Sequence, residues 1–318
     1  MNAALETTEG RQGYGSEAYA TSLRHEGTPL HLEASGSWLI RRPIPGHLGH
    51  FDAVGCYPFL VCRDLGGLST DLSGLDTGEL ITVTAVLDPL GDHAEAELAD
   101  AFPDLLRPYK RHFVVELAGY DATSPSAHHR RNVRRGHAVC RIETVDPPWF
   151  GAEEWVGLYQ VLIERHAIRG RAAFPPAALR AQLRVPGTTL LRARIDDETV
   201  GMVAFVQDGD RAYYHLGAFS ELGYRSFASY ALFDVALRQL SEHARVVLLG
   251  AGAGDQDPGD DGLVRFKRGW GAVERTARLG GRIVDRERYE ALVTRSNEEG
   301  DYFPAYRSPA RRRSPHSS

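Results

Sequence analysis

A run of three strand-like segments in the second half of the chain limits the possible folds more than any other feature. TTLLRARI (188–195), TVGMVAFVQD (199–208) and RAYYHLGAFS (211–220) are rich in β-branched and aromatic residues, which favour strands. The Asp-Asp and Asp-Gly-Asp connections between them suit tight hairpins. The sequence therefore predicts an antiparallel meander.

Helices surround this meander. Helical spacing of apolar residues and prolines at a first helical turn mark two helices before it. The predicted elements are helices over 153–166 and 175–183 before the meander, then a long helix over 225–242, a strand over 246–250, a short helix near 262–267 and a strand pair ending at Ile283. This order fits neither a doubly wound nucleotide-binding fold nor an all-β sandwich.

The first half of the chain gives weaker signals of the same mixed kind. Its predicted elements are strands at 38–40, 57–62, 80–86, 113–117 and 137–144, a helix over 95–102 and a short basic helix within 124–136. The fold class expected is therefore α/β (α+β), with mixed sheets flanked by helices.

Composition narrows the class of protein. Hydrophobic content of 42% and charged content of 25% are typical of a globular enzyme, and 318 residues fit one large or two ordinary domains. The polar N-terminus lacks a secretory pattern and no apolar run is long enough for a membrane span, so a cytoplasmic protein without membrane insertion is expected. A net charge of −5 disfavours a uniformly basic DNA-binding protein but allows a local basic surface.

Several common chemistries lack their motifs. The three cysteines have no CxxC spacing and are expected to be reduced and mostly buried, and we expect no metal site. LLGAGAGDQDPGDDG (248–262) begins like a dinucleotide fingerprint, but four aspartates stand where phosphates belong. Walker A, HExxH and GxSxG motifs are absent from the sequence.

Lys267 stands out because, of 37 lysines and arginines, only Lys110 and Lys267 are lysines. It lies in VRFKRGWG (264–271), where Phe266 is placed to anchor the helix and the glycines around Trp270 let backbone approach closely. A compact ammonium reaches an anionic oxygen as a point charge, whereas a planar guanidinium needs more room. Lys267 is our candidate for stabilising such an oxygen; the alternative is a solvated cation at a helix end.

Two further positions are candidates for the same chemistry. Strand alternation places Tyr213 and His215 on one face, and a neutral imidazole there accepts a proton, although a plain hydrogen-bonded histidine is an equal alternative. Arg225 and Ser226 stand at the start of the long helix, whose free N–H groups favour an anion; an ordinary capped core helix is the alternative. The basic run HHRRNVRR (128–135) is either an anion-binding stripe or a polar helix surface.

From Tyr120 onward the chain resembles the N-acyltransferase (GNAT) superfamily, in its FemAB-like branch. The residues that carry the resemblance are HHRRNVRRG (128–136), AYYHLGAFS (212–220), LLGAGAG (248–254) and above all GLVRFKRGWG (262–271), with a looser match at YPFLVCRDLGGL (57–68). The resemblance implies tandem GNAT-like domains, the second better preserved. We expect a flexible segment over 1–30, a degenerate GNAT-like domain over 31–145, a catalytic one over 146–300 and a flexible basic tail over 301–318.

The resemblance also implies a function and its residues. It implies an acyltransferase that forms an amide on a small metabolite, peptide or cell-wall precursor, without a tightly bound cofactor. The candidate residues are Lys267 and His215 for catalysis, Phe266, Arg225, Ser226, Arg131, Arg134 and Arg135 for the donor and its phosphates, and Tyr213, Tyr57 and Trp270 for the substrate pocket.

The donor and even the activity stay open at this point. ELGYRSFAS (221–229) has one glycine, Gly223, at a different place from the pyrophosphate loop of acetyl-CoA enzymes, which favours aminoacyl-tRNA over acyl-CoA as co-substrate. The arginine-rich segments 128–135 and 307–313 favour tRNA as well. The alternatives are an ordinary acetyl-CoA-dependent enzyme and a non-catalytic ligand-binding module. The oligomeric state is not readable from the sequence.

Overall fold

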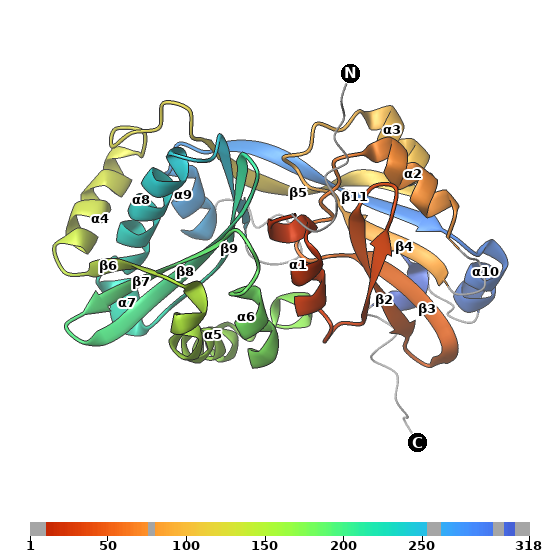
Figure 1. The fold of residues 1–318 in the computed structure, drawn as a ribbon, viewed down its shortest axis with the longest axis horizontal. Coiled ribbons are helices and arrows are strands. Elements are labelled where there is room, and N and C mark those ends of the chain that lie inside the picture. The colour runs from red at the N-terminus through yellow and green to blue at the C-terminus, as the bar shows by residue number, and fades with distance from the viewer. Residues whose placement is uncertain (1–10, 76–79, 253–261, 295–301, 309–318) are drawn as a thin grey trace. The chain divides into compact units, whose positions relative to one another are not determined.

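The chain folds into two compact units, each assembled from two stretches of sequence. The computed structural model describes residues 11–75, 80–252, 262–294 and 302–308. Unit 1 comprises Met1–Ser22 and Lys110–Thr276, and unit 2 comprises Leu23–Tyr109 and Ala277–Ser318. The chain passes between the units at Ser22–Leu23 and within strands β5 (Leu105–Glu116) and β11 (Val273–Ile283), both strands drawn in Figure 1. Its division therefore differs from the expected single boundary near residue 145.

Unit 1 contains the predicted meander. Its elements are η1 Gly13–Gly15, α1 Glu17–Ser22, α4 Ala127–His137, β6 Arg141–Val145, η2 Pro148–Gly151, α5 Ala152–His166, η3 Gly170–Ala172, α6 Pro176–Gln182, β7 Thr188–Ile195, β8 Glu198–Asp208, β9 Arg211–Phe219, α7 Glu221–Arg225, α8 Ala228–Ser241, β10 Val246–Ala251 and α9 Gly262–Arg268. Strands β6 to β9 are antiparallel neighbours in chain order, and β10 pairs in parallel with β9. The three predicted hairpin strands are confirmed.

Helix α8 covers one face of these strands. Leu191 of β7 and Phe205 of β8 point toward this face and share a core cluster with Phe233 and Leu237 of α8. Helix α4 packs on α8, side by side with it in Figure 1, because Gly136 brings the two backbones close: a Cβ there would lie 2.7 Å from the carbonyl oxygen of Phe227.

The long helix predicted over 225–242 is confirmed as α8, Ala228–Ser241, and a separate short helix, α7, precedes it. Phe227 adopts a left-handed conformation with φ of +59°, which separates α7 from α8. Ser220 caps α7, since its Oγ accepts a hydrogen bond from the Gly223 N–H, and α8 has no side-chain cap at its first residue. The connection between strand β9 and helix α8 is therefore itself a short helix, α7.

The N-terminal segment covers the other face of the strands, with α5 and α6. Residues 11–22, which were expected to be flexible, fold as η1 and α1, and the rings of Tyr14 and Tyr19 are fully buried. Tyr14 packs on Tyr213 of β9, with ring centroids 5.0 Å apart. Burial of two large aromatic rings explains the difference, since each contributes apolar area comparable to a core residue.

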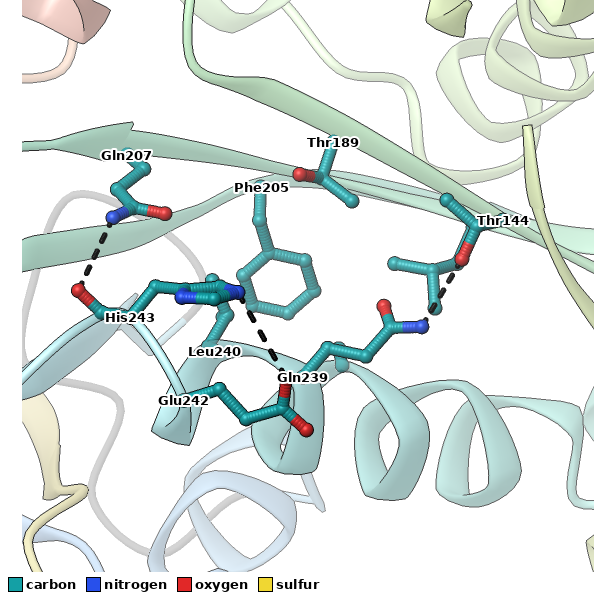
Figure 2. Close-up of a pocket in the computed structure, with 10 residues that line it drawn as sticks. Thr144, Thr189, Phe205, Gln207, Gln239, Leu240, Glu242 and His243 are labelled. Carbon is teal, nitrogen blue, oxygen red and sulfur yellow. Dashed lines mark hydrogen bonds and ion pairs between the residues drawn. The ribbon is translucent and has the colours of Figure 1, made fainter. Parts of the chain in front are cut away.

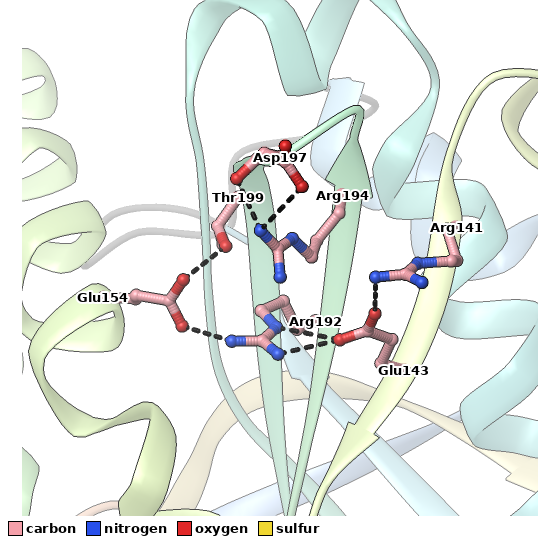
Figure 3. Close-up of polar contacts among 7 residues, drawn as sticks. All are labelled: Arg141, Glu143, Glu154, Arg192, Arg194, Asp197 and Thr199. Atoms are coloured by element: carbon pink, nitrogen blue, oxygen red, sulfur yellow. Dashed lines mark hydrogen bonds and ion pairs between the residues drawn. The ribbon is translucent and has the colours of Figure 1, made fainter.

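A polar network joins α5 to the same face of the sheet (Figure 3). Arg192 of β7 donates to Glu143 of β6 at 2.7 Å and to Glu154 of α5 at 2.5 Å. The Thr199 hydroxyl also donates a hydrogen bond to Glu154, at 2.6 Å. The hydrogen bonds from Arg192 lower the pKa of Glu143 below its ordinary value.

Arg192→Gln is expected to lower the free energy of unfolding by about 1–2 kcal/mol, because it removes charge-assisted hydrogen bonds to two carboxylates that are only partly exposed. The matched control is Arg180→Gln, which breaks the more exposed pair between Arg180 and Glu153 and should cost no more than ~0.5 kcal/mol. Urea unfolding measures both. Equal losses for the two variants would contradict the role assigned to the network.

Unit 2 is a second, smaller mixed structure. Its elements are β1 Thr28–Leu32, β2 Ser37–Ile44, β3 His47–Gly55, α2 Leu65–Ser73, β4 Leu80–Val86, α3 Glu95–Ala101, α10 Arg286–Thr294 and η4 Ala305–Arg307, with parts of β5 and β11. Its strands are ordered β1-β2-β3-β4-β11. The predicted strand over 57–62 is wrong: this segment forms only one bridge, Leu60 to Leu87, since Pro58 has no N–H for a ladder.

The segment 302–308, expected in a flexible tail, packs on unit 2. Asp52 of β3 is 1% exposed and pairs with Arg42 and Arg307, and the Tyr306 hydroxyl meets Thr82 at 2.6 Å. A buried carboxylate needs such partners because an unpaired buried charge is costly. The guanidinium of Arg307 is therefore part of the fold; residues 309–318 lie outside the described part of the chain.

Cys56, Cys62 and Cys140 are free and buried, as predicted. Across the described ranges, no cluster of three or more His, Cys, Asp or Glu side chains has a geometry suited to a metal ion. No helix in the described part of the chain has the length and apolarity that a bilayer crossing requires.

Candidate functional site

Strands β9 and β10 stop pairing part-way along their length. Their parallel register runs from Val246 with Arg211 to Leu248 with Tyr213, and both strands continue beyond it. Each strand has an irregularity there: β10 shifts register against β5 before Gly250, and β9 shifts against β8 between Tyr214 and Leu216. We call the segment formed by Tyr214, Gly250 and Ala251 the β9–β10 divergence.

Lys267 lies at this divergence. Its side chain extends from α9, is 5% exposed, and donates through Nζ to the carbonyl oxygen of Ala251 at 2.5 Å. Nζ also stands 5.9 Å from the ring centroid of Tyr214, so it contacts both strands. Gly250 leaves the space for it, because its φ is +81° and a Cβ there would lie 3.2 Å from Nζ.

His112 belongs to the same site, although it was not among the candidates predicted from the sequence. It lies on β5 directly opposite Ala251, whose carbonyl accepts the Lys267 hydrogen bond, and it is 6% exposed. Burial, and then the positive charge of Lys267, lowers the pKa of His112 to about 3. The predicted strand began one residue later, at Phe113. The sequence feature that could have identified His112 is its position directly before the apolar run of this strand.

Aromatic side chains anchor α9 in the core. The rings of Phe266 and Trp270 pack on Phe233 of α8 at 4.9 and 5.8 Å, and Trp270 is fully buried. Trp270, predicted in the substrate pocket, is therefore a core residue. Phe266, predicted at the donor site, packs against the same core cluster.

His129 of α4 ties α9 to this core. Its Nε2 lies 2.7 Å from the carbonyl oxygen of Phe266, which only accepts, so Nε2 carries the proton. Its Nδ1 then accepts from the Ser126 hydroxyl at 3.1 Å. Burial lowers the pKa of His129 and favours this neutral form. The basic helix thus has a buried structural face.

His215, the other predicted catalytic residue, lies on the opposite face of β9. Its Nε2 donates to Oε1 of Gln182 at 3.1 Å, and its Nδ1 accepts from the Tyr14 hydroxyl at 2.9 Å. Burial lowers its pKa to about 3. Tyr213, predicted in the substrate pocket, is 1% exposed on this same face, against Tyr14.

The structure therefore does not bring Lys267 and His215 together. The ring of Tyr214 packs 4.8 Å from Phe233 of α8, which places it on the α8 face, and Lys267 approaches that ring. His215 instead contacts residues of η1 and α6 on the face covered by α5. With both nitrogens engaged and a depressed pKa, His215 is suited to holding the N-terminal segment.

The predicted phosphate-binding residues lie on the surface around the start of α8. Arg131, Arg134 and Arg135 are exposed on α4, and within the residues described none of the three pairs with a carboxylate. The guanidinium of Arg135 stacks 3.9 Å from the ring of Phe227, immediately before α8. Arg225 is exposed and pairs with Glu221 at 3.4 Å.

Of three other predicted features, Ser226 lies at this surface. Ser226 ends α7 at the junction with α8. Tyr57 belongs to unit 2. Most of the glycine-rich run after β10, residues 253–261, lies outside the described residues.

Comparison with known proteins shows which solved structures share the fold of this chain. No protein-family model and no curated protein matches the chain. The solved structure of FemX matches with a TM-score of 0.65 over 89% of this chain and 96% of FemX, at 12% identity. The chain has a FemX-type, GNAT-like fold.

Two more solved structures agree with this FemX-type fold. The C-terminal domain of a putative lysylphosphatidylglycerol synthetase from Agrobacterium fabrum matches with a TM-score of 0.58 and 14% identity, over 85% of this chain and 88% of that one. L-PGS from Bacillus licheniformis matches with a TM-score of 0.57 and 13% identity, over 88% and 96%. The fold class expected from the sequence is confirmed.

Proposed function

We propose that this chain is an acyltransferase that joins an activated acyl or aminoacyl group to the amine of a small metabolite, peptide or cell-wall precursor. The observation that carries the proposal is the ammonium of Lys267, held at the β9–β10 divergence by Ala251 and given space by Gly250. A substrate carbonyl bound between the diverging ends of β9 and β10 would meet the positive charge of this lysine.

The chemistry that suits this arrangement is attack of a neutral amine on an ester or thioester carbonyl. The new C–N bond gives a tetrahedral intermediate with a negative oxygen, which the Lys267 ammonium stabilises. An ammonium has three donors, so one hydrogen bond to Ala251 is compatible with another to the substrate. The intermediate collapses by breaking the bond to the leaving oxygen or sulfur, and the proton lost by the amine passes to that leaving group.

Aminoacyl-tRNA is the favoured donor over acyl-CoA. In this chain Gly223 serves packing, because a Cβ there would lie 2.0 Å from the carbonyl oxygen of Val200, and the turn of α7 occupies the hairpin-to-helix connection. No open glycine loop for a pyrophosphate is present in this connection. The three exposed arginines of α4, Arg131, Arg134 and Arg135, have no carboxylate partner among the described residues and instead offer a cationic surface on that helix, and Arg135 stacks on Phe227 just before α8.

The test is incubation of the protein with charged tRNA and, separately, with a panel of acyl-CoAs, in the presence of amine acceptors, followed by mass spectrometry for a new amide. We expect transfer from aminoacyl-tRNA. Transfer only from acetyl-CoA would favour the ordinary acetyltransferase, and a co-purified ligand without any transfer would favour a binding module.

A binding experiment tests the donor separately. Replacing Arg131, Arg134 and Arg135 together by glutamine should remove about three units from the slope of log affinity for tRNA against log salt, since each arginine releases about one counterion. Arg180→Gln, on the exposed surface of α6, is the matched control. A tRNA affinity that does not depend on salt would argue against tRNA as the donor.

A further inference from the structure

A pocket of about 280 Å³ lies between the C-terminal half of α8 and the strands β6, β7 and β8 (Figure 2). The ten residues that line it are Thr144, Thr189, Leu191, Phe205, Gln207, Ala236, Gln239, Leu240, Glu242 and His243. The short side chains of Thr189 and Ala236 leave the helix–sheet layer unfilled here. Its size is at the small end for ligand pockets, which typically start near ~300 Å³.

The floor of the pocket is apolar. Leu191, Phe205 and Ala236 are each 1% exposed and Leu240 is 7% exposed, so together they present a buried apolar surface. An aromatic or branched aliphatic group placed on them is removed from water, which is the main favourable term for a small ligand.

The polar rim is oriented to accept hydrogen bonds. The Gln207 amide nitrogen donates to the carbonyl oxygens of Gly209 and His243, at 2.9 and 3.4 Å, so its Oε1 is directed toward the pocket. The Gln239 amide nitrogen donates to the Thr144 hydroxyl at 3.1 Å, which turns its Oε1 inward as well. Figure 2 shows the oxygens of Gln207 and Gln239 on either side of the Phe205 ring and the Thr189 hydroxyl above it.

The charges around the pocket favour a cation. Glu242 supplies a carboxylate at the rim, where it lies 3.8 Å from Nε2 of His243, and none of the ten lining residues is a lysine or arginine. Arg238, the nearest basic residue along α8, is bound to Asp234 at 3.0 Å. Arg192 lies on β7 but turns to the opposite face, toward α5.

We propose that this pocket binds an amphipathic primary ammonium, with its apolar body on Leu191, Phe205 and Leu240 and its N–H groups on the oxygens of Gln207, Gln239 and Glu242. The pocket is separate from Lys267, because Phe205 and Tyr214 pack together between them with ring centroids 5.5 Å apart. The proposal therefore does not depend on the proposed transferase activity.

Three probes of similar shape and different charge test it by calorimetry at pH 8: phenethylammonium, 2-phenylethanol and 3-phenylpropionate. At this pH an alkylammonium keeps its charge. We expect saturable binding of phenethylammonium with a Kd on the order of a millimolar or below, as for a ligand of this size. We expect the alcohol to bind at least ~5-fold more weakly and the carboxylate not at all.

Variants at the exposed rim assign the binding to this pocket. Gln239→Lys should abolish phenethylammonium binding. Gln239→Glu, whose carboxylate can accept from the Thr144 hydroxyl where the glutamine amide donates to it, should tighten binding about threefold. Glu198→Gln, at the exposed start of β8, is the control and should change nothing. Ala236→Leu should block the pocket, and because its core position risks the fold, the rim variants decide the outcome without it.

Two results would overturn the proposal. One is equal binding, or no saturable binding, of the three probes. The other is binding of phenethylammonium that survives Gln239→Lys unchanged.

Discussion

Lys267→Met is expected to lower kcat of the amide-forming reaction by about 100-fold or more. Methionine keeps the length and most of the packing of the stem but removes the ammonium next to Ala251. A fixed donor aimed at a developing oxyanion typically contributes ~3 kcal/mol, and each 1.4 kcal/mol corresponds to about tenfold in rate. Because the interaction forms with the transition state, kcat should fall while KM changes little.

Lys267→Arg and Arg265→Ala complete this experiment. The planar guanidinium is too wide for the space that Gly250 leaves beside Nζ, so arginine should not restore activity. Arg265 lies exposed on the same helix, and its replacement by alanine should leave the rate within about twofold. Circular dichroism checks that each variant folds. A Lys267→Met protein that folds and retains full turnover would remove the central assignment.

The second half of the fold was readable from sequence because its signals are local. Alternation in β7, β8 and β9 and the Asp-rich turns between them are properties of neighbouring residues, and they place these strands correctly. The break at Phe227 was not predictable in this way, since a left-handed phenylalanine depends on its packing against α4 through Arg135 and Gly136. Similarly, the docking of Tyr14 on Tyr213 joins residues about 200 positions apart.

The candidate site shows the same limit. The rarity of lysine identified Lys267, and the structure gives it burial and two strand contacts. His112 escaped notice because its proximity to Lys267 comes from the register of β5 against β10, which no local pattern specifies. His215 looked equally promising, but strand alternation does not say which face carries Lys267.

Unit 1 should lose stability as the pH falls from 8 to 5, because His112 and His215 are held neutral in the folded state. Burial lowers the pKa of each to about 3, whereas an unfolded chain binds the proton near pH ~6.5. Below pH ~6.5 the unfolded state therefore binds more protons than the folded state, and the free energy of unfolding decreases as pH falls, until each folded pKa is reached. The loss between pH 8 and pH 5 is about 2 kcal/mol for each histidine.

Urea unfolding at a series of pH values, followed by the fluorescence of the buried Trp155 and Trp270, measures this slope. His215→Gln should reduce the loss between pH 8 and pH 5 by about 2 kcal/mol, because glutamine accepts from Tyr14 and donates to Gln182 but does not titrate, while His112 and His129 still contribute. Its stability at pH 8 should fall as well, owing to the smaller side chain. His243→Gln is the control, since its side chain is 70% exposed, and it should leave the slope as it is. Carboxylates with lowered pKa values add to the loss mainly below pH 5, where the unfolded chain begins to bind their protons, and they add equally in the unaltered chain and in the variants. A slope in the His215→Gln protein equal to that of the unaltered chain would show that His215 is not held neutral by its burial against the N-terminal segment.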